Sequence, residues 1–535
     1  MTPLARRGSI PRNVIHRSPY PDVAIPDRPL TEWLLESAER RPQQPAFIEA
    51  SSGRTLTFGD WTLLVRRGAG ALSRRGLGKG DVFGVYSPNL PEYAVLFHAV
   101  SLAGGITTTA NPLLTSDELA VQLRDAGARF LATAPPFLDK ARAAAERAGV
   151  EEVFVFGEAA GATPFAALVA DDVAPPPVRI DPAHDVVALP YSSGTTGLPK
   201  GVMLTHRNLV ANIEQCAALP DSLCREGDVV VGVLPFFHIY GLVVVMNLSL
   251  RVGATVVTMP RFEMEPFLEA IERYGVSYAN VVPPIVLGLA KHPAVAKHRL
   301  SSLRIVFSGA APLGEAVSNA ASARLGCPVL QGYGLTETSP VTHACPAAPD
   351  RARPGSIGVP LPSTDCKVVD IASGEELPAG QEGEICIRGP QVMKGYLNRP
   401  EATAAMIDGE GWLHTGDVGR ADGDGYFHVV DRVKELIKYK GCQVAPAELE
   451  ALLLTHPAVA DAAVVPRPDD EAGEVPKAFV VLKGEATPVS IVEWVAQHVA
   501  PHKRVREVEV IDQIPKSASG KILRRVLVER ERGRA

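Results

Sequence analysis

The chain has 535 residues, of which 46% are hydrophobic and 21% charged, and its formal net charge is −6. This length suggests several packed units, and the composition is that of a globular protein. With 54 Lys and Arg against 60 Asp and Glu, the charge balance gives no electrostatic case for binding nucleic acid or a membrane surface. We therefore expect no nucleic-acid partner. The oligomeric state is left open between a monomer and a homodimer.

Short β-rich runs alternate with helical patterns from residue 82 onward. The first series consists of strands expected at 82–86, 106–109 and 130–133, with helices at 91–103 and 116–126. The second series has strands expected at 229–234, 254–259, 277–282, 303–307 and 329–331. Strands separated by helices predict doubly wound parallel sheets. Residues 158–180, rich in Ala, Gly and Pro, are expected to form a surface connection.

The pattern changes after residue 354. Strands expected at 366–369, 383–388 and 426–430 are separated by Gly-containing turns, which predicts a small antiparallel unit, β-barrel-like. A compact α+β unit follows from residue 435, with a helix at 446–454 and strands at 459–465 and 478–482. The fold class is therefore α/β, with two doubly wound sheets, a β-barrel-like subdomain and a small α+β C-terminal domain.

Targeting and disulfide signals are weak. The seven cysteines form no Cys-x-x-Cys pair, which favours reduced thiols over a disulfide frame or a zinc site. Residues 1–13 contain arginines without an apolar segment, so they do not form a secretory signal, and we expect them to be disordered. The most apolar run, 239–250, is shorter than the ~20 residues that span a bilayer. We expect a cytoplasmic protein.

A hydroxyl-rich loop at residues 191–202, YSSGTTGLPKGV, follows the apolar run 186–190. After a buried strand, such a loop can direct backbone N–H groups and hydroxyls toward phosphate oxygens, and Lys200 adds a cation. The glycine and lysine spacing does not fit the Walker pattern, so this is not an ordinary P-loop. The alternative is a flexible surface loop.

A second segment, residues 331–338 with the sequence QGYGLTET, follows an expected strand. Open α/β sheets bind ligands at the carboxyl ends of their strands. Tyr333 offers a flat face for a purine, and Glu337 could hold Mg²⁺. A structural loop is equally compatible with this segment.

Three single residues are weaker candidates when each is taken alone. Asp417, in WLHTGD, could accept hydrogen bonds from ribose hydroxyls, or it could stabilise its own turn. His238 lies among aromatic residues in the sequence. Such a histidine is more often packed in a core, but these residues could equally line an apolar pocket for an acid. Lys521 precedes two arginines and could belong to a solvated basic face.

Together and in this order, these segments resemble the adenylate-forming superfamily of acyl-CoA synthetases, luciferases and adenylation domains. The resemblance covers residues 16–525. The stretches VVPPIVLGLAKHP (281–293), SGAAPLG (308–314) and VVDRVKELIKYKGCQVAPAELE (429–450) are similar to those of the 4-coumarate–CoA ligase branch, of the cinnamate–CoA ligase type. The resemblance implies that a carboxylate attacks the α-phosphate of Mg-ATP, giving acyl-AMP and pyrophosphate, and that the thiol of coenzyme A then displaces AMP.

The resemblance also assigns roles to residues. Catalytic roles fall to Lys521, His238, Lys438 and Gln443, and Glu337 serves Mg²⁺. ATP and AMP binding fall to Ser192, Ser193, Gly194, Thr195, Thr196, Gly197, Lys200, Ala310, Gln331, Gly332, Tyr333, Gly334, Thr336, Asp417 and Arg432. The acyl pocket is assigned to Tyr240, Val243, Val244, Asn280, Phe307, Gly309, Pro340 and Val341, and coenzyme A to Lys440, Gly441 and Arg261.

A mobile C-terminal domain is a further implication of the resemblance. It places a hinge at Lys434, between an N-terminal AMP-binding domain (1–433) and a C-terminal domain (434–535). Rotation between the half-reactions would withdraw Lys521 and present the face that carries Lys438, Lys440, Gly441 and Gln443 to coenzyme A.

The chain departs from the plant pattern in the acyl pocket. Val243, Val244 and Phe307 are apolar at positions where plant 4-coumarate ligases carry polar residues and a lysine. A pocket that cannot bond the 4-hydroxyl has little means to require it, so we expect cinnamate-like acids with weaker dependence on that hydroxyl. Asn280 could restore one polar contact. Cys442 replaces the usual aromatic residue, with no clear effect on the coenzyme A face.

Four rival functions remain open. A medium- or long-chain fatty acyl-CoA ligase would differ in the depth of its pocket, and a luciferase-like oxidoreductase would emit light after adenylation. An amino-acid adenylation domain would place an aspartate in the pocket, but residues 229–262 include no acidic residue. A non-enzymatic ATP-binding module would have no use for Lys521.

Overall fold

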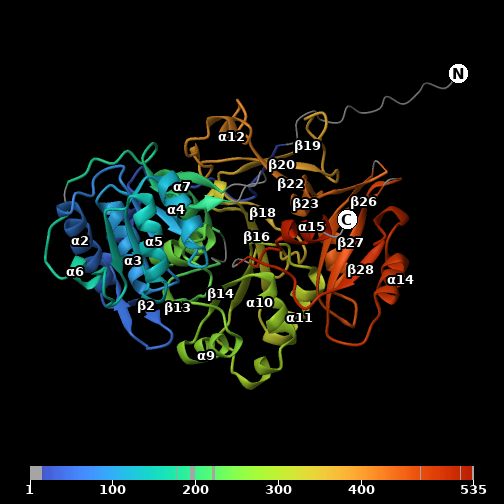
Figure 1. Ribbon diagram of the computed structural model, residues 1–535, viewed down its shortest axis with the longest axis horizontal. Helices are drawn as coiled ribbons and strands as arrows, with labels where there is room; N and C mark the ends of the chain where they lie inside the picture. The colour runs from blue at the N-terminus through green and yellow to red at the C-terminus, as the bar shows by residue number, and fades with distance from the viewer. Residues whose placement is uncertain are drawn as a thin grey trace.

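The computed structural model describes residues 15–175, 177–192, 199–219, 223–440, 442–469, 471–517 and 520–532 (Figure 1). Only the backbone is described for residues 442, 443 and 532. The N-terminal segment 1–13, expected to be disordered, lies outside these residues. No helix in the described part of the chain is both long and apolar enough to cross a membrane.

The first large sheet has a parallel centre, because β4 pairs in parallel with both β5 and β6, and β6 with β7. Its strand order is β10 (Tyr191–Ser192), β11 (Lys200–Thr205), β9 (Val186–Ala188), β5 (Ile106–Ala110), β4 (Val82–Tyr86), β6 (Ala128–Thr133), β7 (Glu152–Val155), β8 (Thr163–Pro164). The associated helices are α2 (Phe58–Arg74), α3 (Pro91–Leu102), α4 (Ser116–Ala126), α5 (Leu138–Ala148), α6 (Ala166–Val169) and α7 (His206–Ala217). Every residue of β4 is buried, as expected for a strand covered on both faces.

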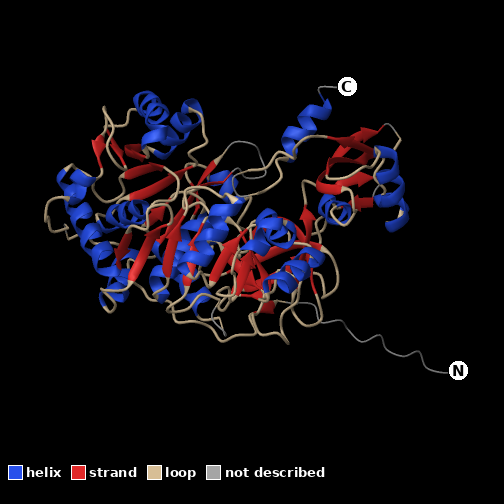
Figure 2. Ribbon diagram, turned by 90° about the horizontal axis from the view of Figure 1, so that it is seen from below, coloured by secondary structure: helices blue, strands red, loops and turns tan. Residues whose placement is uncertain are grey.

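The second large sheet is also parallel at its centre, where β15 pairs with β14 and β16. Its order is β18 (Val359–Pro360), β17 (Val341–Ala344), β16 (Val329–Gly334), β15 (Ile305–Ser308), β14 (Tyr278–Val281), β12 (Val229–Gly232), β13 (Thr255–Thr258), β2 (Pro45–Glu49), β3 (Thr55–Thr57). Its helices are α1 (Leu30–Glu39), a π-helix (Tyr240–Asn247), α8 (Leu248–Val252), α9 (Met264–Tyr274), α10 (Pro283–Lys291) and α11 (Glu315–Leu325). One apolar core joins both large sheets, and helices cover their faces (Figure 2).

Two smaller units follow. An antiparallel sheet has the order β1 (His16–Arg17), β19 (Asp365–Val369), β20 (Gly383–Arg388), β22 (Leu413–Ala421), β23 (Phe427–Arg432), with β21 (Gly395–Tyr396) paired to β11 and α12 (Pro400–Ala404) beside it. The C-terminal unit contains β24 (Ile437–Tyr439), β25 (Cys442–Val444), β26 (Val459–Asp469), β27 (Gly473–Leu482), β28 (Glu507–Val510), α13 (Pro446–Leu453), α14 (Pro488–His498) and α15 (Arg524–Arg532). This unit has apolar cores of its own and lies at one end of the molecule (Figures 1 and 2).

The expected α/β fold is confirmed, with one correction. Residues 158–180 are not a plain surface connection, because β8 extends the first sheet and α6 buries Leu168. The helix expected at 116–126 is α4, where Thr115 and Glu118 form a capping box and Gly127 ends the helix with a φ of +67°.

Candidate active site

The ends of the hydroxyl-rich loop are fixed by a strand pair. Ser192 of β10 lies opposite Lys200 of β11 in the antiparallel register. Residues 193–198 lie outside the described part of the chain, so the roles expected for Ser193, Gly194, Thr195, Thr196 and Gly197 stay predictions. The ammonium of Lys200 lies 5.0 Å from the centre of the Tyr396 ring. Lys200 of β11 therefore makes a cation–π contact with Tyr396 of β21, the strand that pairs with β11.

Tyr396 also contacts the expected metal-binding carboxylate. Its hydroxyl donates to Glu337 Oε1 at 2.8 Å. Burial raises the pKa of Tyr396, so the phenol keeps its proton at neutral pH. The sequence interpretation missed this residue, because only the pairing of Val202 with Tyr396 between β11 and β21 brings it beside Lys200. An aromatic residue in the turn-rich segment KGYLN was the one available signal.

Asp417 is held from two sides. The Tyr333 hydroxyl donates to Asp417 Oδ2 at 2.5 Å, and Arg432 Nε lies 3.4 Å from Oδ1. The register of β22 against β23 places Asp417 directly opposite Arg432. Burial raises the pKa of Asp417, and the Arg432 charge opposes this shift. Tyr333 and Arg432 thereby fix the direction of the carboxylate.

Lys521, in the C-terminal unit, is close enough to these groups for their charges to interact. Burial and the nearby Arg432 charge lower the pKa of Lys521, and the carboxylates of Asp417 and Glu337 act in the opposite direction. His238 belongs to the same group, because burial together with the Lys521 charge lowers the pKa of His238 to about 3. His238 is therefore neutral at pH 7 and can act through a hydrogen bond but not as a charge.

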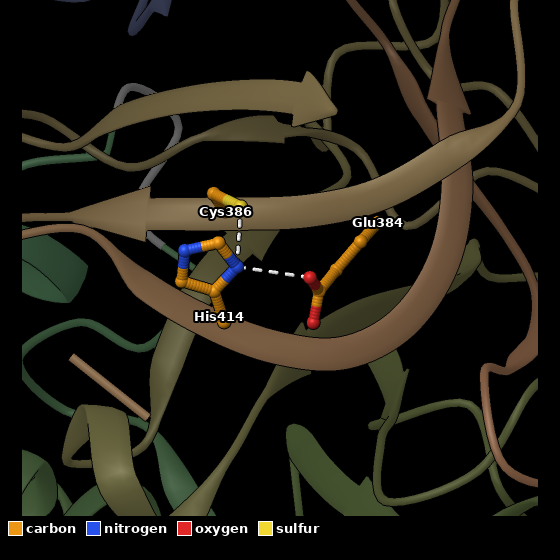
Figure 3. Close-up of side chains that lie close together, drawn as sticks. All are labelled: Glu384, Cys386 and His414. Atoms are coloured by element: carbon orange, nitrogen blue, oxygen red, sulfur yellow. Dashed lines mark hydrogen bonds and ion pairs between the residues drawn. The ribbon is translucent and has the colours of Figure 1, made fainter. Parts of the chain in front are cut away.

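A cluster of three side chains supports the part of β22 before Asp417, where the register against β20 shifts (Figure 3). Glu384 Oε1 accepts the Gly416 N–H at 2.8 Å, and Oε2 lies 2.9 Å from His414 Nδ1. Cys386 Sγ lies 3.5 Å from the same nitrogen. The Cys386 sulfur and the Glu384 carboxylate raise the pKa of His414 to about 10. These residue types could ligate a metal ion, but here they contact one another and support this part of β22.

The residues expected in the acyl pocket are apolar, except for the polar groups of Tyr240 and Asn280. Val243 and Val244 lie on the π-helix, and the Phe307 backbone pairs with Asn280 between β14 and β15. The Tyr240 hydroxyl lies 3.2 Å from Asn280 Oδ1 and 3.2 Å from the Phe307 carbonyl. Asn280 Nδ2 is buried and has no hydrogen-bond partner within the described residues.

Small residues in this region permit close approaches. A Cβ at Gly309 would lie 2.7 Å from the Tyr240 ring, and one at Gly332 would lie 2.7 Å from the Phe307 ring. A Cβ at Gly334 would lie 2.1 Å from the Pro340 carbonyl oxygen, so no other residue fits there. The remaining positions are the buried Pro340 and Val341, Ala310 with a φ of +72°, and Thr336 at the start of a 3₁₀ turn.

Gln331, expected to bind the nucleotide, has a hydrogen bond within the fold. Gln331 Oε1 accepts the Leu313 N–H at 3.1 Å, so its buried amide supports the backbone of the neighbouring loop.

Two of the residues expected to bind coenzyme A pair with carboxylates outside this group. Within the described residues, Lys440 pairs with Glu471 at 3.2 Å and the exposed Arg261 pairs with Glu263. Lys438 lies on β24, with an exposed side chain. Gly441 and the Gln443 side chain are outside the described part. Lys434 lies in a turn that the Glu435 N–H closes onto the Arg432 carbonyl at 3.0 Å.

Comparisons with known proteins give a consistent result. The chain matches the AMP-binding enzyme family over residues 34–397 and the AMP-binding enzyme C-terminal domain over residues 448–521. It is 48% identical over 530 residues to 4-coumarate–CoA ligase 5 of Oryza sativa subsp. japonica, covering 97% of this chain and 98% of that protein. It is 44% identical over 524 residues to 4-coumarate–CoA ligase 1 of Petroselinum crispum, covering 96% of each.

Solved structures agree with these relatives. An anthranilate CoA ligase, AuaEII, in complex with anthranoyl-AMP superposes with a TM-score of 0.87 at 28% identity, covering 95% of this chain and 98% of that chain. ATP-bound MatB from Rhodopseudomonas palustris gives a TM-score of 0.84 at 30% identity, covering 93% of this chain and 98% of that one.

Proposed function

The chain belongs to the AMP-binding enzyme family and is an ATP-dependent acid–CoA ligase, and we propose that its acids are cinnamates. In the first step, a carboxylate oxygen attacks the α-phosphorus of ATP, and the bond to pyrophosphate breaks. In the second step, the sulfur of coenzyme A attacks the acyl carbon, and AMP leaves. The 4-coumarate–CoA ligase relatives, at 44% and 48% identity over nearly the full length, support this reaction and favour cinnamates over fatty acids as substrates.

The first step needs cations near the α-phosphate, where charge develops. We assign this role to Lys521, whose charge interacts with those of Asp417, Glu337 and Arg432. Asp417 accepts hydrogen bonds from the ribose hydroxyls, and Tyr333 stacks on adenine while its hydroxyl holds Asp417. Residues 192–200 bind the departing pyrophosphate.

Mg²⁺ enters with the nucleotide, and Glu337 fits it. Glu337 is 5% exposed, and Tyr396 donates to its Oε1; no hydrogen bond to Oε2 is found within the described residues, so Oε2 is the oxygen we assign to the cation. Carboxylate oxygens are ligands that Mg²⁺ prefers, and the ion keeps waters and phosphate oxygens as its other ligands.

The acyl pocket supports an aromatic acid with little dependence on its 4-hydroxyl. Val243, Val244 and Phe307 are all buried and apolar. Asn280 Nδ2, which has no partner within the described residues, is a donor for a substituent on the aromatic ring of the acid. We therefore expect both cinnamate and 4-coumarate to bind. This buried apolar group with one unpaired donor is the observation that carries the substrate assignment.

Rotation about Lys434 completes the cycle in this proposal. The two domains would meet at residues 433 and 434, and the second step would exchange Lys521 for the face that carries Lys438 and Lys440. We further propose that the enzyme acts in the cytoplasm.

A thioester assay with ATP, Mg²⁺ and coenzyme A tests the proposal. The acids are cinnamate, 4-coumarate, caffeate, benzoate, octanoate and palmitate. We expect the cinnamates to give the highest kcat/KM, with cinnamate and 4-coumarate within about tenfold of each other. A higher kcat/KM for octanoate or palmitate would overturn the substrate assignment.

A further inference from the structure

A line of alternating charges runs from the expected ribose site into the C-terminal unit. Asp417 Oδ1 lies 3.4 Å from Arg432 Nε, and Arg432 Nη1 lies 3.9 Å from Glu435 Oε1. Arg524 Nη1 donates to Glu435 Oε2 at 2.5 Å, and its Nη2 donates to Glu450 Oε2 at 2.7 Å. Each inner charge therefore has an opposite charge on both sides.

Arg524 is the most constrained member of this line. Its side chain is 16% exposed, and its Nε also donates to the Val464 carbonyl at 3.3 Å. Glu450 Oε1 accepts the Val464 N–H at 2.8 Å, so β26 and α13 both fix the carboxylate that Arg524 contacts. A planar guanidinium with three fixed acceptors has one available orientation.

Lys521 lies three residues before Arg524, in a short hairpin. The Ser517 N–H donates to the Lys521 carbonyl at 2.8 Å, and the Leu523 N–H donates to the Pro515 carbonyl at 2.8 Å. Lys516 anchors one end of the hairpin through Asp461 at 2.6 Å. Arg524, the first residue of α15, anchors the other end.

Two contacts next to Arg524 cross the proposed hinge. Arg432 precedes Lys434 and Glu435 follows it, so their pairing spans the hinge. Asp431, also before the hinge, accepts the Ala447 N–H of α13 at 2.8 Å. The Asp431 carboxylate is close enough to Arg524 for their charges to interact. Arg524 is thus placed where the hinge, α13 and the Lys521 hairpin meet.

We propose that Arg524 is a positioning residue for acyl-AMP formation, holding the Lys521 hairpin against the Asp417–Arg432 pair through Glu435. This inference rests on the proposed function. The cross-hinge contacts belong to the arrangement in which Lys521 faces Asp417 and Arg432. Arg524 therefore acts on the first half-reaction and not on thioester formation, which uses the rotated arrangement.

The two half-reactions are measured separately for Arg524→Gln. Pyrophosphate release from cinnamate and ATP without coenzyme A reports the first step, and thioester formation from supplied cinnamoyl-AMP and coenzyme A reports the second. We expect the first rate to fall about 10²-fold, because a displacement of about 1 Å at the reacting groups costs this much. The second rate should change less than about threefold. Arg525→Gln is the matched control, because Arg525 is 77% exposed and pairs with Glu529 one helical turn away.

Glu435→Gln keeps the inference testable if Arg524→Gln does not fold. This milder change, at a residue with a 27% exposed side chain, should also slow the first step selectively. Arg524→Gln combined with Glu435→Gln should cost less than the two single effects added, because both act through one contact. Equal loss of both half-reactions, or an unchanged first step, would overturn the positioning role. A wild-type enzyme that forms no acyl-AMP from any acid would instead overturn the proposed function.

Discussion

The Tyr333 hydroxyl and Asp417 Oδ2 are 2.5 Å apart, so the residue expected to stack on adenine also orients the residue expected to bind ribose. The phenol keeps its proton because burial, followed by the Asp417 charge, raises the pKa of Tyr333. It therefore donates to the carboxylate, which is the stronger kind of hydrogen bond. One side chain thus couples the two ends of the nucleoside site.

Tyr333→Phe tests this coupling. The ring face is kept and the donor is lost, so Asp417 loses its hydrogen bond and keeps its ion pair with Arg432. A hydrogen bond to a charged group contributes about 1.5–3 kcal/mol, so kcat/KM for ATP should fall about 10- to 100-fold. Steady-state kinetics with ATP varied at saturating acid measures this. An unchanged kcat/KM would show that the hydroxyl does not organise the ribose site.

Lys521→Ala should abolish acyl-AMP formation and leave thioester formation from supplied acyl-AMP largely intact. The physical reason is that Lys521 lies near Asp417, Glu337 and Arg432 and supplies a cation where charge develops on the α-phosphate. Pyrophosphate release should fall at least about 10²-fold. Arg525→Ala, which removes an exposed cation four residues after Lys521, controls for loss of charge in the same segment. Comparable losses in both half-reactions would contradict this division of roles.

Phe307→Lys should raise the preference for 4-coumarate over cinnamate. Phe307 is 4% exposed and its backbone pairs with Asn280, so an ammonium there would add a second donor beside Asn280 Nδ2, which has no partner within the described residues. One new hydrogen bond of about 1 kcal/mol predicts a shift of about fivefold in the ratio of kcat/KM values. Phe307→Met is the matched control, because it changes the side chain without adding a donor. An unshifted ratio would remove the argument from pocket polarity.

The sequence was sufficient to predict the parallel sheets, because β-rich runs separated by helices are typical of strands that helices cover on both faces. The sequence also singled out Asp417 and Tyr333, whose side chains the structure brings into contact from β22 and β16. It could not supply Tyr396, because contact with Lys200 depends on the pairing of β11 with β21, almost 200 residues later in the chain. Arg524 was missed for the same reason. Beside Arg525 it resembles a solvated basic face, and only the packing of α15 on α13 and β26 distinguishes a 16% exposed arginine from a 77% exposed one.

His414 predicts a pH dependence of stability. The Cys386 sulfur and the Glu384 carboxylate raise the pKa of His414 from its ordinary value of 6.5 to about 10. A raised pKa means that the folded protein binds the proton more tightly than the unfolded chain does. The stabilising contribution is therefore complete below about pH 6.5 and is lost as the pH rises through about 10.

The measurement compares the thermal midpoints of the wild type and His414→Gln between pH 6 and pH 10. The wild type should have the higher midpoint at pH 6.5, and the difference between the two proteins should shrink steadily toward pH 10. His428→Gln, on the neighbouring strand β23, controls for removing an imidazole from the same sheet. A constant difference across this range would mean that His414 contributes to stability as a neutral ring. The Glu384 carboxylate would then stabilise this part of β22 through its hydrogen bond to the Gly416 N–H, and not through the charge of His414.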